Sequence, residues 1–200
     1  MIAIIDYGMG NLRSVQKALE QAGARDCRIT QSILDIRSAT HVVLPGVGAI
    51  APAMEKLRSL KIVEPVKDAV KMGKPFLGIC LGFQLLFEKS FEYGTTEGLG
   101  ILKGTVERFS DSVKVPQMGW NQLQLRPCAL WNGIKNGEYV YFCHSFYVKP
   151  ADDRAIASTT QYGTDYCSAV AKDNLFAVQF HPEKSQTAGL KILENFINLK

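Results

Sequence analysis

The sequence contains few cysteines, and none of them forms a metal-binding or redox motif. The five cysteines, at positions 27, 80, 128, 143 and 167, are odd in number and far apart, and no Cys-x-x-Cys occurs. Such a set argues against a disulfide framework and against a structural zinc site. We therefore expect free thiols in a reducing cytoplasmic compartment, without a metal or an organic cofactor.

Long hydrophobic runs and blocks of like charge are also missing. The longest apolar run covers twelve residues, 76–87, which is too short to cross a bilayer, and the first residues lack the basic flank and cleavage site of a signal peptide. Lys and Arg exceed Asp and Glu by 12 to 10 in residues 1–100 and by 11 to 9 in residues 101–200, so each half carries +2. Nucleic acid or an anionic membrane is therefore a poor candidate for the main partner.

The remaining composition is that of an ordinary globular protein. Of the 200 residues, 46% are hydrophobic and 21% are charged. A chain of this length buries enough surface to fold without a metal or a disulfide. No internal repeat or linker divides it, so we expect a single domain over residues 1–200.

Strands and helices alternate in the first half of the chain. Strands are predicted at residues 2–6, 41–44 and 75–79, and helices at residues 12–22, 54–60, 62–72 and 81–89, with a short helix after Ser32. This alternation indicates right-handed βαβ units on a parallel sheet. In the second half, strands are predicted at residues 105–109, 122–126, 138–148, 154–161, 166–171 and 175–180, and a helix at 188–199. The fold class is therefore α/β, with a parallel sheet followed by a mixed or antiparallel layer.

Cys80 is the best candidate for a catalytic nucleophile. It is the centre of Gly78-Ile79-Cys80-Leu81-Gly82, which follows an apolar strand and precedes a helix. This pattern is the cysteine version of the nucleophile elbow, in which a sharp turn exposes the central side chain and the flanking glycines avoid clashes. A helix N-terminus also favours the thiolate, and the Leu81 N–H points to where an oxyanion would form. The alternative, a small buried core residue, fits the other four cysteines better.

A thiol nucleophile needs a base, and His181 is the best placed of the three histidines. It ends a strand, where α/β folds place their sites, whereas His41 opens a strand among apolar residues. His144 lies within a strand, and its side chain could face either way. Glu183 follows His181 by two residues, so an extended chain stiffened by Pro182 would put both side chains on one face. That carboxylate would orient the imidazole, unless the two groups form only a surface ion pair.

Two glycine-rich turns follow strands of the first half. Pro45-Gly46-Val47-Gly48 follows the strand before that of Cys80, where it could present N–H groups to a carbonyl oxygen or be a plain turn. Gly8-Met9-Gly10 is similar to the start of a dinucleotide-binding motif, but Arg13 replaces the third glycine and no acidic residue ends the next strand. We therefore do not expect a nucleotide cofactor.

Six longer motifs occur in a fixed order between residues 5 and 185. They are Ile-Asp-Tyr-Gly-Met-Gly-Asn at 5–11, Leu-Pro-Gly-Val-Gly-Ala at 44–49, Gly-Ile-Cys-Leu-Gly-Phe-Gln at 78–84, Pro-Gln-Met-Gly-Trp-Asn at 116–121, His-Ser-Phe at 144–146 and Gln-Phe-His-Pro-Glu-Lys-Ser at 179–185. The third and sixth resemble the class I, triad-type glutamine amidotransferases. All six together resemble most closely the glutaminase subunits of imidazole glycerol phosphate synthase. The resemblance covers nearly the whole chain and implies a three-layer, flavodoxin-like fold.

The resemblance implies a role for each of these residues. Cys80 would attack the side-chain amide carbon of glutamine, His181 would transfer the proton, and Glu183 would orient His181. The backbone N–H groups of Val47 and Leu81 would form the oxyanion hole. Glutamine would be held by Gly46, Gly48, Gln84, His144, Ser145 and Phe146. Ammonia would leave first, and water would then hydrolyse the glutamyl thioester.

By the same resemblance, the ammonia passes to a separate (β/α)8 cyclase subunit, with which the chain would form a heterodimer. There it reacts with a ribulosyl aminoimidazole carboxamide nucleotide, giving imidazole glycerol phosphate and an aminoimidazole carboxamide ribotide, a step of histidine biosynthesis. Asn11, Met118, Trp120 and Lys184 match positions at this interface, with Trp120 in a Gly-Trp loop. Ile50 departs from the family, which usually has an aromatic residue at this position.

Two other functions remain open. The chain could be a glutaminase that serves another synthase, such as an anthranilate, aminodeoxychorismate or pyridoxal phosphate synthase, although the motif at 116–121 argues against this. It could also be a binding subunit that keeps the fold without turnover, although all three triad candidates are present.

Overall fold

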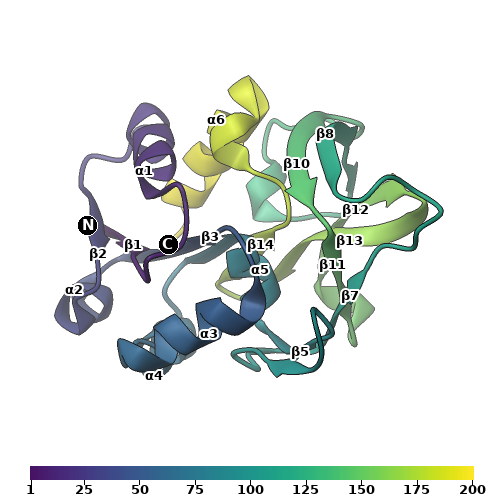
Figure 1. Cartoon of the computed structure of the whole chain (residues 1–200). Coiled ribbons are helices and arrows are strands. Elements are labelled where there is room, and N and C mark those ends of the chain that lie inside the picture. Colours follow the sequence, from purple (N-terminus) through teal and green to yellow (C-terminus); the bar gives the residue numbers. More distant parts are fainter.

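Five parallel strands form one half of the central sheet. The computed structural model describes all residues from Met1 to Lys200. The strands are β1 (Ile2–Ile5), β2 (Cys27–Thr30), β3 (His41–Gly46), β4 (Phe76–Cys80) and β14 (Leu175–Val178), in the order β2-β1-β3-β4-β14 (Figure 1). Gly46 of β3 is paired with Cys80 of β4, and Val178 of β14 lies beside Ile79. The segments that follow β3, β4 and β14 therefore meet at one edge of the sheet.

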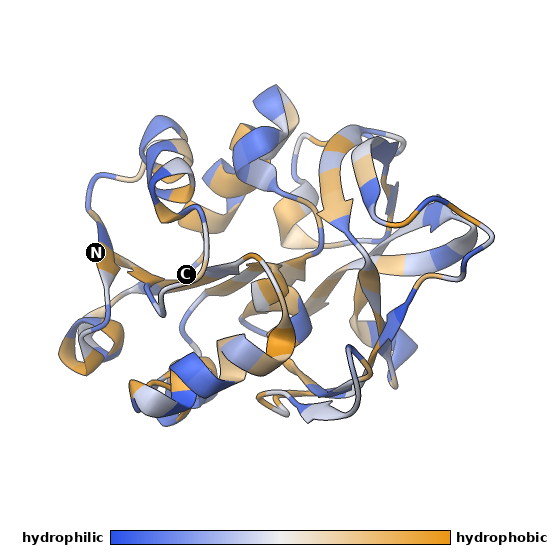
Figure 2. Ribbon diagram, in the orientation of Figure 1, coloured by the Kyte–Doolittle hydropathy of each residue, from blue (hydrophilic) through white to orange (hydrophobic).

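Helices cover both faces of these strands, because successive side chains of a strand point to opposite faces. In β1, Ala3 and Ile5 pack in the core beneath α2 (Ile33–Ser38), α3 (Ile50–Ser59), α4 (Val63–Lys71) and α5 (Leu81–Leu85). Ile2 and Ile4 pack in the opposite core, beneath α1 (Leu12–Gln21) and α6 (Gln186–Ile197). The strands between these two helix layers are largely orange in Figure 2. The predicted three-layer α/β architecture is confirmed.

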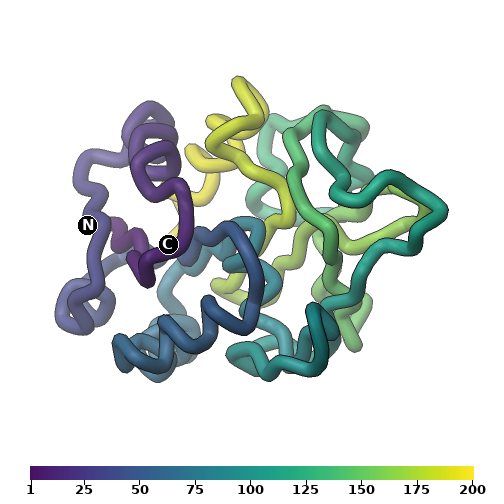
Figure 3. Tube along the Cα trace, in the orientation of Figure 1, coloured from purple at the N-terminus to yellow at the C-terminus, as the bar shows by residue number.

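The two ends of the chain meet within one of these layers. Figure 3 shows the purple N-terminal segment and the yellow C-terminal helix, and α1 packs against α6. The His41 ring packs edge-on against Phe196 of α6, with 5.4 Å between ring centroids. His41 is thus part of the core between β3 and α6. No helix in the structure is long and apolar enough to cross a membrane.

The second half of the chain extends the sheet and adds a smaller one. From β14 the main sheet continues through β13 (Thr164–Lys172), β11 (Phe146–Pro150), β7 (Leu102–Arg108), β5 (Phe87–Ser90) and β6 (Thr96–Glu97). Two further strands, β12 (Ile156–Tyr162) and β9 (Gln124–Leu125), pair beyond β13, and β10 (Tyr139–His144) pairs with β8 (Gln117–Gln122) in a separate sheet. Short 3-10 turns occur at Ala129–Trp131, Asp153–Ala155 and Pro182–Lys184. Because β5 is parallel to β7 while most of these pairs are antiparallel, the predicted mixed layer is confirmed.

The helix predicted at residues 81–89 is wrong beyond its first turns. The helix α5 ends at Leu85, and residues 87–90 form strand β5. The carbonyl groups of Leu85, Leu86 and Phe87 accept hydrogen bonds from the N–H groups of residues 99–102 instead of from a continuing helix. Pairing with a segment more than ten residues away therefore replaces the local helical hydrogen bonds.

Two predicted strands are divided differently in the structure. The predicted strand 138–148 is interrupted at Ser145, because β10 pairs with β8 whereas β11 pairs with β7 in the main sheet. The predicted strand 122–126 is divided at Leu123 between the end of β8 and the short β9. Strand β8 starts at Gln117 and includes Trp120, which lies opposite Tyr141. Trp120 is thus a strand residue, and its predicted position in a loop is wrong.

Candidate active site

Cys80 lies in a strained turn between β4 and α5. Its backbone has φ +54° and ψ −107°, a region that residues other than glycine rarely adopt. A Cβ atom at Gly82 would collide with the carbonyl oxygen of Leu44 on β3, and one at Gly78 would come within 3.1 Å of the Gly82 oxygen. The two glycines thus allow the close packing beneath the turn that a nucleophile elbow requires. Cys80 is 7% exposed and lines a cavity.

His181 lies beside the sulfur of Cys80, and Glu183 is bonded to His181. His181 follows β14, the neighbour of β4, and its Nδ1 donates a hydrogen bond to Glu183 Oε1 at 2.8 Å. Because the two side chains are only 5% and 3% exposed, this pair is not a solvated surface ion pair. The backbone is a 3-10 turn, Pro182–Lys184, and not the extended segment that was predicted. Proline at the first position favours such a turn, and the Ser185 hydroxyl donates to the His181 carbonyl at 2.7 Å.

The surroundings of His181 favour its protonated form. Burial alone would lower the pKa of this imidazole, but hydrogen bonds to the Cys80 sulfur and the Glu183 carboxylate, with the charges of both groups, raise it to about 10. His144 shows the opposite behaviour, because burial lowers its pKa to about 4. Its Nδ1 donates to the Phe146 carbonyl oxygen at 2.7 Å. At neutral pH, therefore, His181 carries a proton while His144 is a neutral side chain of the cavity wall.

A cavity of about 430 Å³ opens beside Cys80 and collects most of the predicted site residues. Its lining comprises Val47, Gly48, Ala49, Cys80, Leu81, Gln84, Glu92, Tyr93, Pro116, Cys143, His144, Ser145, Phe146, His181 and Lys184. Gly46 is absent from this lining, although the sequence prediction included it among the glutamine-binding residues. It is buried at the end of β3, where a Cβ atom would collide with the Tyr7 hydroxyl.

Two backbone turns that contain the predicted oxyanion-hole residues line the cavity. Leu81 is the first residue of α5, so its N–H has no acceptor within the helix. Val47 is 44% exposed in the turn after β3, and Gly48 has φ +97°, which favours glycine there. Since β3 and β4 are adjacent, the turn that contains Val47 faces the turn that contains Cys80.

The opposite wall is built around Gln84 of α5. Its Nε2 donates to the Phe146 carbonyl oxygen at 2.9 Å and to Gln179 Oε1 at 3.0 Å. These bonds connect α5 with β11 and with the residue that follows β14. The wall is thus cross-linked by amide groups instead of being formed by loose side chains.

Of the residues at this site that the sequence prediction misses, Glu92 and Gln179 make polar contacts there. Glu92 is the only carboxylate in the lining; its Oε2 accepts a hydrogen bond from the Ile50 N–H at 2.9 Å, and burial raises its pKa. Gln179 is fully buried, and its Nε2 lies 3.8 Å from the Cys80 sulfur. Gln179 stands two residues before His181 in a recognisable motif, which is a usable signal. Glu92 lies in a polar loop, and no motif or periodicity marks it.

The residues predicted at a partner interface are exposed on the surface. Asn11 caps α1, and on β8 the side chains of Met118 and Trp120 are 65% and 46% exposed. The Lys184 ammonium lies 5.7 Å from the centre of the Tyr141 ring, which packs edge-on against Trp120. Trp120, Tyr141 and Lys184 thus form one surface group, and Lys184 also lines the cavity at Cys80.

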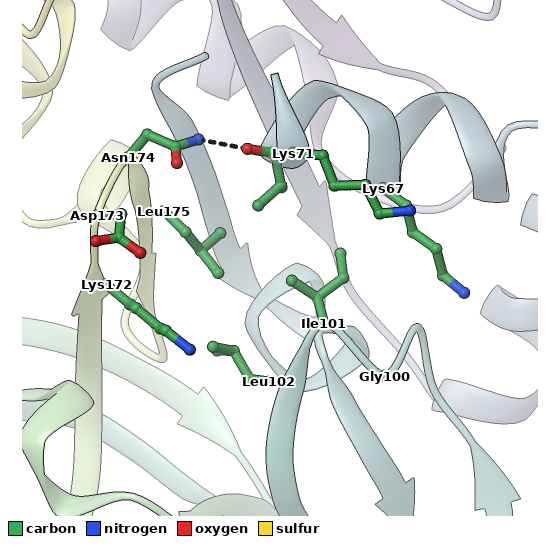
Figure 4. A pocket seen from close by; sticks show the side chains of 10 residues that line it. Lys67, Lys71, Gly100, Ile101, Leu102, Lys172, Asp173, Asn174 and Leu175 are labelled. Carbon is green, nitrogen blue, oxygen red and sulfur yellow. Dashed lines mark hydrogen bonds between the residues drawn. The ribbon is translucent and has the colours of Figure 1, made fainter. Parts of the chain in front are cut away.

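A larger cavity, of about 540 Å³, lies at the opposite end of the sheet. Lys67, Lys71 and Lys172 surround its apolar floor of Ile101, Leu102 and Leu175 (Figure 4). Leu175 begins β14, whereas His181 lies beyond the other end of that strand. No nucleophile and base lie together there, so the smaller cavity at Cys80 is the candidate active site. No group of three or more His, Cys, Asp or Glu residues is arranged to hold a metal ion.

Comparison with known proteins agrees with this fold. Residues 3–199 match the family described as glutamine amidotransferase class-I. The fold is similar to that of PurLQS from Thermotoga maritima, with a TM-score of 0.74 and 20% identity over 98% of this chain and 97% of that one. At this identity the likeness concerns the fold alone. Fold, site and family match together define a class I glutamine amidotransferase.

Much closer relatives identify the branch of this class. The imidazole glycerol phosphate synthase subunit HisH of Syntrophotalea carbinolica is 50% identical over 204 residues, which cover 98% of both chains. The same subunit of Gloeothece citriformis is 52% identical over 203 residues, covering 99% of this chain and 95% of the relative. The chain therefore belongs to the HisH family, and the resemblance seen in its motifs is confirmed.

Proposed function

We propose that this chain hydrolyses L-glutamine to glutamate and ammonia as the glutaminase subunit of imidazole glycerol phosphate synthase. The observation that carries the proposal is that Cys80, in its elbow, and His181 line the same cavity, while the buried Glu183 carboxylate accepts a hydrogen bond from His181. A thiol beside a carboxylate-oriented imidazole is the arrangement that cysteine acyl-transfer enzymes use.

In the resting enzyme, His181 holds a proton because its pKa is raised. The adjacent sulfur is then stabilised as the thiolate, which is the nucleophilic form of cysteine. Glu183 binds the Nδ1–H group and thereby leaves Nε2 directed toward the sulfur and the substrate. The acid is thus in place beside the nucleophile before glutamine binds.

In the first half-reaction, the Cys80 thiolate attacks the side-chain amide carbon of glutamine. The N–H groups of Val47 and Leu81 stabilise the oxyanion of the tetrahedral intermediate. The His181 imidazolium gives its proton to the amide nitrogen, the C–N bond breaks, and ammonia leaves. A glutamyl thioester and a neutral imidazole remain.

In the second half-reaction, water attacks the carbonyl carbon of the thioester while neutral His181 takes its proton. The same two N–H groups stabilise the second oxyanion. The C–S bond then breaks, which releases glutamate, with its new carboxyl proton lost to solvent, and restores the thiolate and the imidazolium. The sum is one glutamine and one water converted to one glutamate and one ammonia.

The cavity walls supply groups for the rest of the glutamine molecule. Gly48, Gln84 and the segment His144, Ser145 and Phe146 surround the space next to Cys80. Glu92 is the single carboxylate in this lining, so it is the group that binds the α-ammonium of the substrate. Gly46 contributes through packing behind the Val47 turn and not through a direct contact.

Ammonia then passes to a (β/α)8 cyclase subunit in a heterodimer. That subunit uses it to convert a ribulosyl aminoimidazole carboxamide nucleotide into imidazole glycerol phosphate and an aminoimidazole carboxamide ribotide. Asn11, Met118, Trp120 and Lys184 form the contact surface for the cyclase. The five cysteines are all free thiols, which fits the reducing environment of the cytoplasm, where we place this single-domain subunit.

Glutamate release from glutamine tests this proposal directly. The purified chain is assayed alone and with a cyclase subunit that carries its ligand, and a Cys80→Ala protein serves as the blank. The expected result is a large increase with the cyclase that is absent in the blank. Folded protein that releases no glutamate under either condition would exclude a glutaminase and favour a binding subunit.

A further inference from the structure

Gln179 places a neutral amide against the nucleophile from the side of β14. It is the first residue after this strand, it is 0% exposed, and its backbone N–H donates to the Ser168 carbonyl of β13 at 2.9 Å. Its side-chain Nε2 lies 3.8 Å from the Cys80 sulfur. A fully buried amide beside a reactive sulfur is costly unless its donors and acceptor are all used.

The hydrogen bonds of Gln84 determine which end of the Gln179 amide faces the sulfur. Gln84 Nε2 donates to both the Phe146 carbonyl oxygen, at 2.9 Å, and Gln179 Oε1, at 3.0 Å, so both of its hydrogens are occupied. If the Gln179 amide were rotated by half a turn, two NH2 groups would face each other. Its oxygen would also face the sulfur, and two acceptors would repel. Only one orientation, with N–H toward Cys80, satisfies the network.

We propose that Gln179 is a positioning residue that donates an N–H hydrogen bond to the Cys80 thiolate and holds it in line with the substrate wall formed by Gln84 and Phe146. This proposal rests on the proposed glutaminase function. A thiolate accepts hydrogen bonds more strongly than a neutral thiol, so the contact shortens when the sulfur is charged. An amide does not titrate, so Gln179 stabilises the anion without competing with His181 for the proton.

The same network links nucleophile and substrate. Gln84 lines the cavity and has both N–H groups engaged, which leaves its Oε1 as the free acceptor for glutamine. Gln179 itself does not line the cavity, and its side chain contacts the Cys80 sulfur and Gln84. Gln179 therefore influences the reactivity of Cys80 more than the affinity for glutamine.

The pH dependence of Cys80 alkylation tests this role. Iodoacetamide labelling of the full chain is followed by mass spectrometry between pH 5 and 10, for the parent protein and for Gln179→Met, which keeps the length of the side chain and removes the donor. We expect the midpoint of alkylation to move up by about one pH unit, the equivalent of one charge-assisted hydrogen bond. With glutamine and the cyclase, kcat falls about tenfold and KM changes less than twofold.

Ser168→Ala is the matched control, because Ser168 is also fully buried, bonds through its hydroxyl to Ser158 at 2.8 Å and lies on the strand next to Gln179. It is expected to lower stability and leave the alkylation midpoint unchanged. If Gln179→Met does not fold by circular dichroism, Gln179→Glu replaces it, and its carboxylate raises the midpoint further. An unchanged midpoint in either folded variant would overturn the proposal. Alkylation needs no glutamine turnover, so this result is independent of whether the parent protein proves to be a glutaminase.

Discussion

At the scale of single residues, the site separates charges by environment. His181 is protonated near neutral pH because the Cys80 sulfur and the Glu183 carboxylate stabilise the imidazolium. His144, which lines the same cavity, stays neutral because burial lowers its pKa. Glu92 is half-buried and keeps one oxygen on the Ile50 N–H. The His181 imidazolium, the Cys80 nucleophile and the second carboxylate oxygen of Glu92 thus belong to residues that line a single cavity. The roles of Glu92 and Glu183 differ, and two substitutions separate them.

Glu92→Gln is expected to raise KM for glutamine by about 10- to 100-fold and to change kcat little. The substitution removes one charge-assisted contact to the substrate ammonium, worth about 1.5–3 kcal/mol, and leaves Cys80 untouched. Steady-state glutamate release measures the effect. Glu97→Gln, which replaces an exposed carboxylate on β6, the strand that follows the loop of Glu92, is the control and should behave as the parent. A Glu92→Gln enzyme with unchanged KM would show that the ammonium binds elsewhere.

Glu183→Gln is expected to lower kcat by roughly 100-fold or more, because the amide no longer stabilises the imidazolium or fixes its tautomer. The carboxylate is one of the groups that raise the pKa of His181, so its loss also moves the alkaline limb of the rate profile to lower pH. The measurement is kcat between pH 6 and 10. Glu194→Gln removes a surface partner of Lys191 instead and should cost less than twofold. Equal profiles for both variants would argue against the role of Glu183.

At the scale of elements, the sequence patterns predicted those features that depend only on neighbouring residues within one strand, turn or helix. The strand ending at Cys80 and the cap at Asn11 both follow from adjacent residues. The structure of residues 81–90 could not be predicted in this way, because the carbonyl groups of Leu85, Leu86 and Phe87 accept hydrogen bonds from residues 99–102. The interruption of the predicted strand at Ser145 could not be predicted either, since β10 and β11 pair with different strands that are far away in the sequence. Glu92 reaches the cavity through such remote pairing, so no local pattern could identify it.

The nucleophile elbow leaves little room for an added side chain at Gly82. Gly82→Ala is expected to lower the free energy of unfolding by about 1–3 kcal/mol and to abolish glutamate release, because the added Cβ runs into the Leu44 carbonyl and pushes α5 away from β3. Denaturant unfolding and the glutamate assay measure the two effects. Gly78→Ala is the graded comparison, since its Cβ meets neighbours only at 3.1 Å and should cost less. A Gly82→Ala protein with parental stability and rate would contradict this packing argument.

At the scale of the whole molecule, the mixed sheet joins two halves whose residues complete one site. The parallel half supplies Cys80, the Val47 turn and, through β14, His181, while the antiparallel half supplies the wall at His144–Phe146. Both histidines are therefore buried where the two halves meet. The pKa of His181 is raised and that of His144 is lowered. Folding stability is consequently linked to pH from both sides.

If only these two histidines are considered, the free energy of unfolding should be highest near pH 6.5. The pKa of His144 is lowered from 6.5 to about 4, so the folded state resists its protonation. Its stabilising effect is complete above pH 6.5 and is lost on acidification, by about 2 kcal/mol down to pH 5. The pKa of His181 is raised to about 10, so its effect is complete below pH 6.5 and is lost as the pH rises toward 10.

Urea unfolding of the parent, His144→Gln and His181→Gln proteins at pH 5 to 9 tests these signs separately. His144→Gln should flatten the decline between pH 6.5 and 5, a window above the range in which most carboxylates are protonated. His181→Gln should flatten the decline between pH 7 and 9 and change the acidic limb only slightly, because the charge of His181 is the smallest cause of the low pKa of His144. Since each substitution acts mainly on one limb, a variant that leaves its own limb unchanged would show that the two buried histidines do not set the pH dependence of this fold.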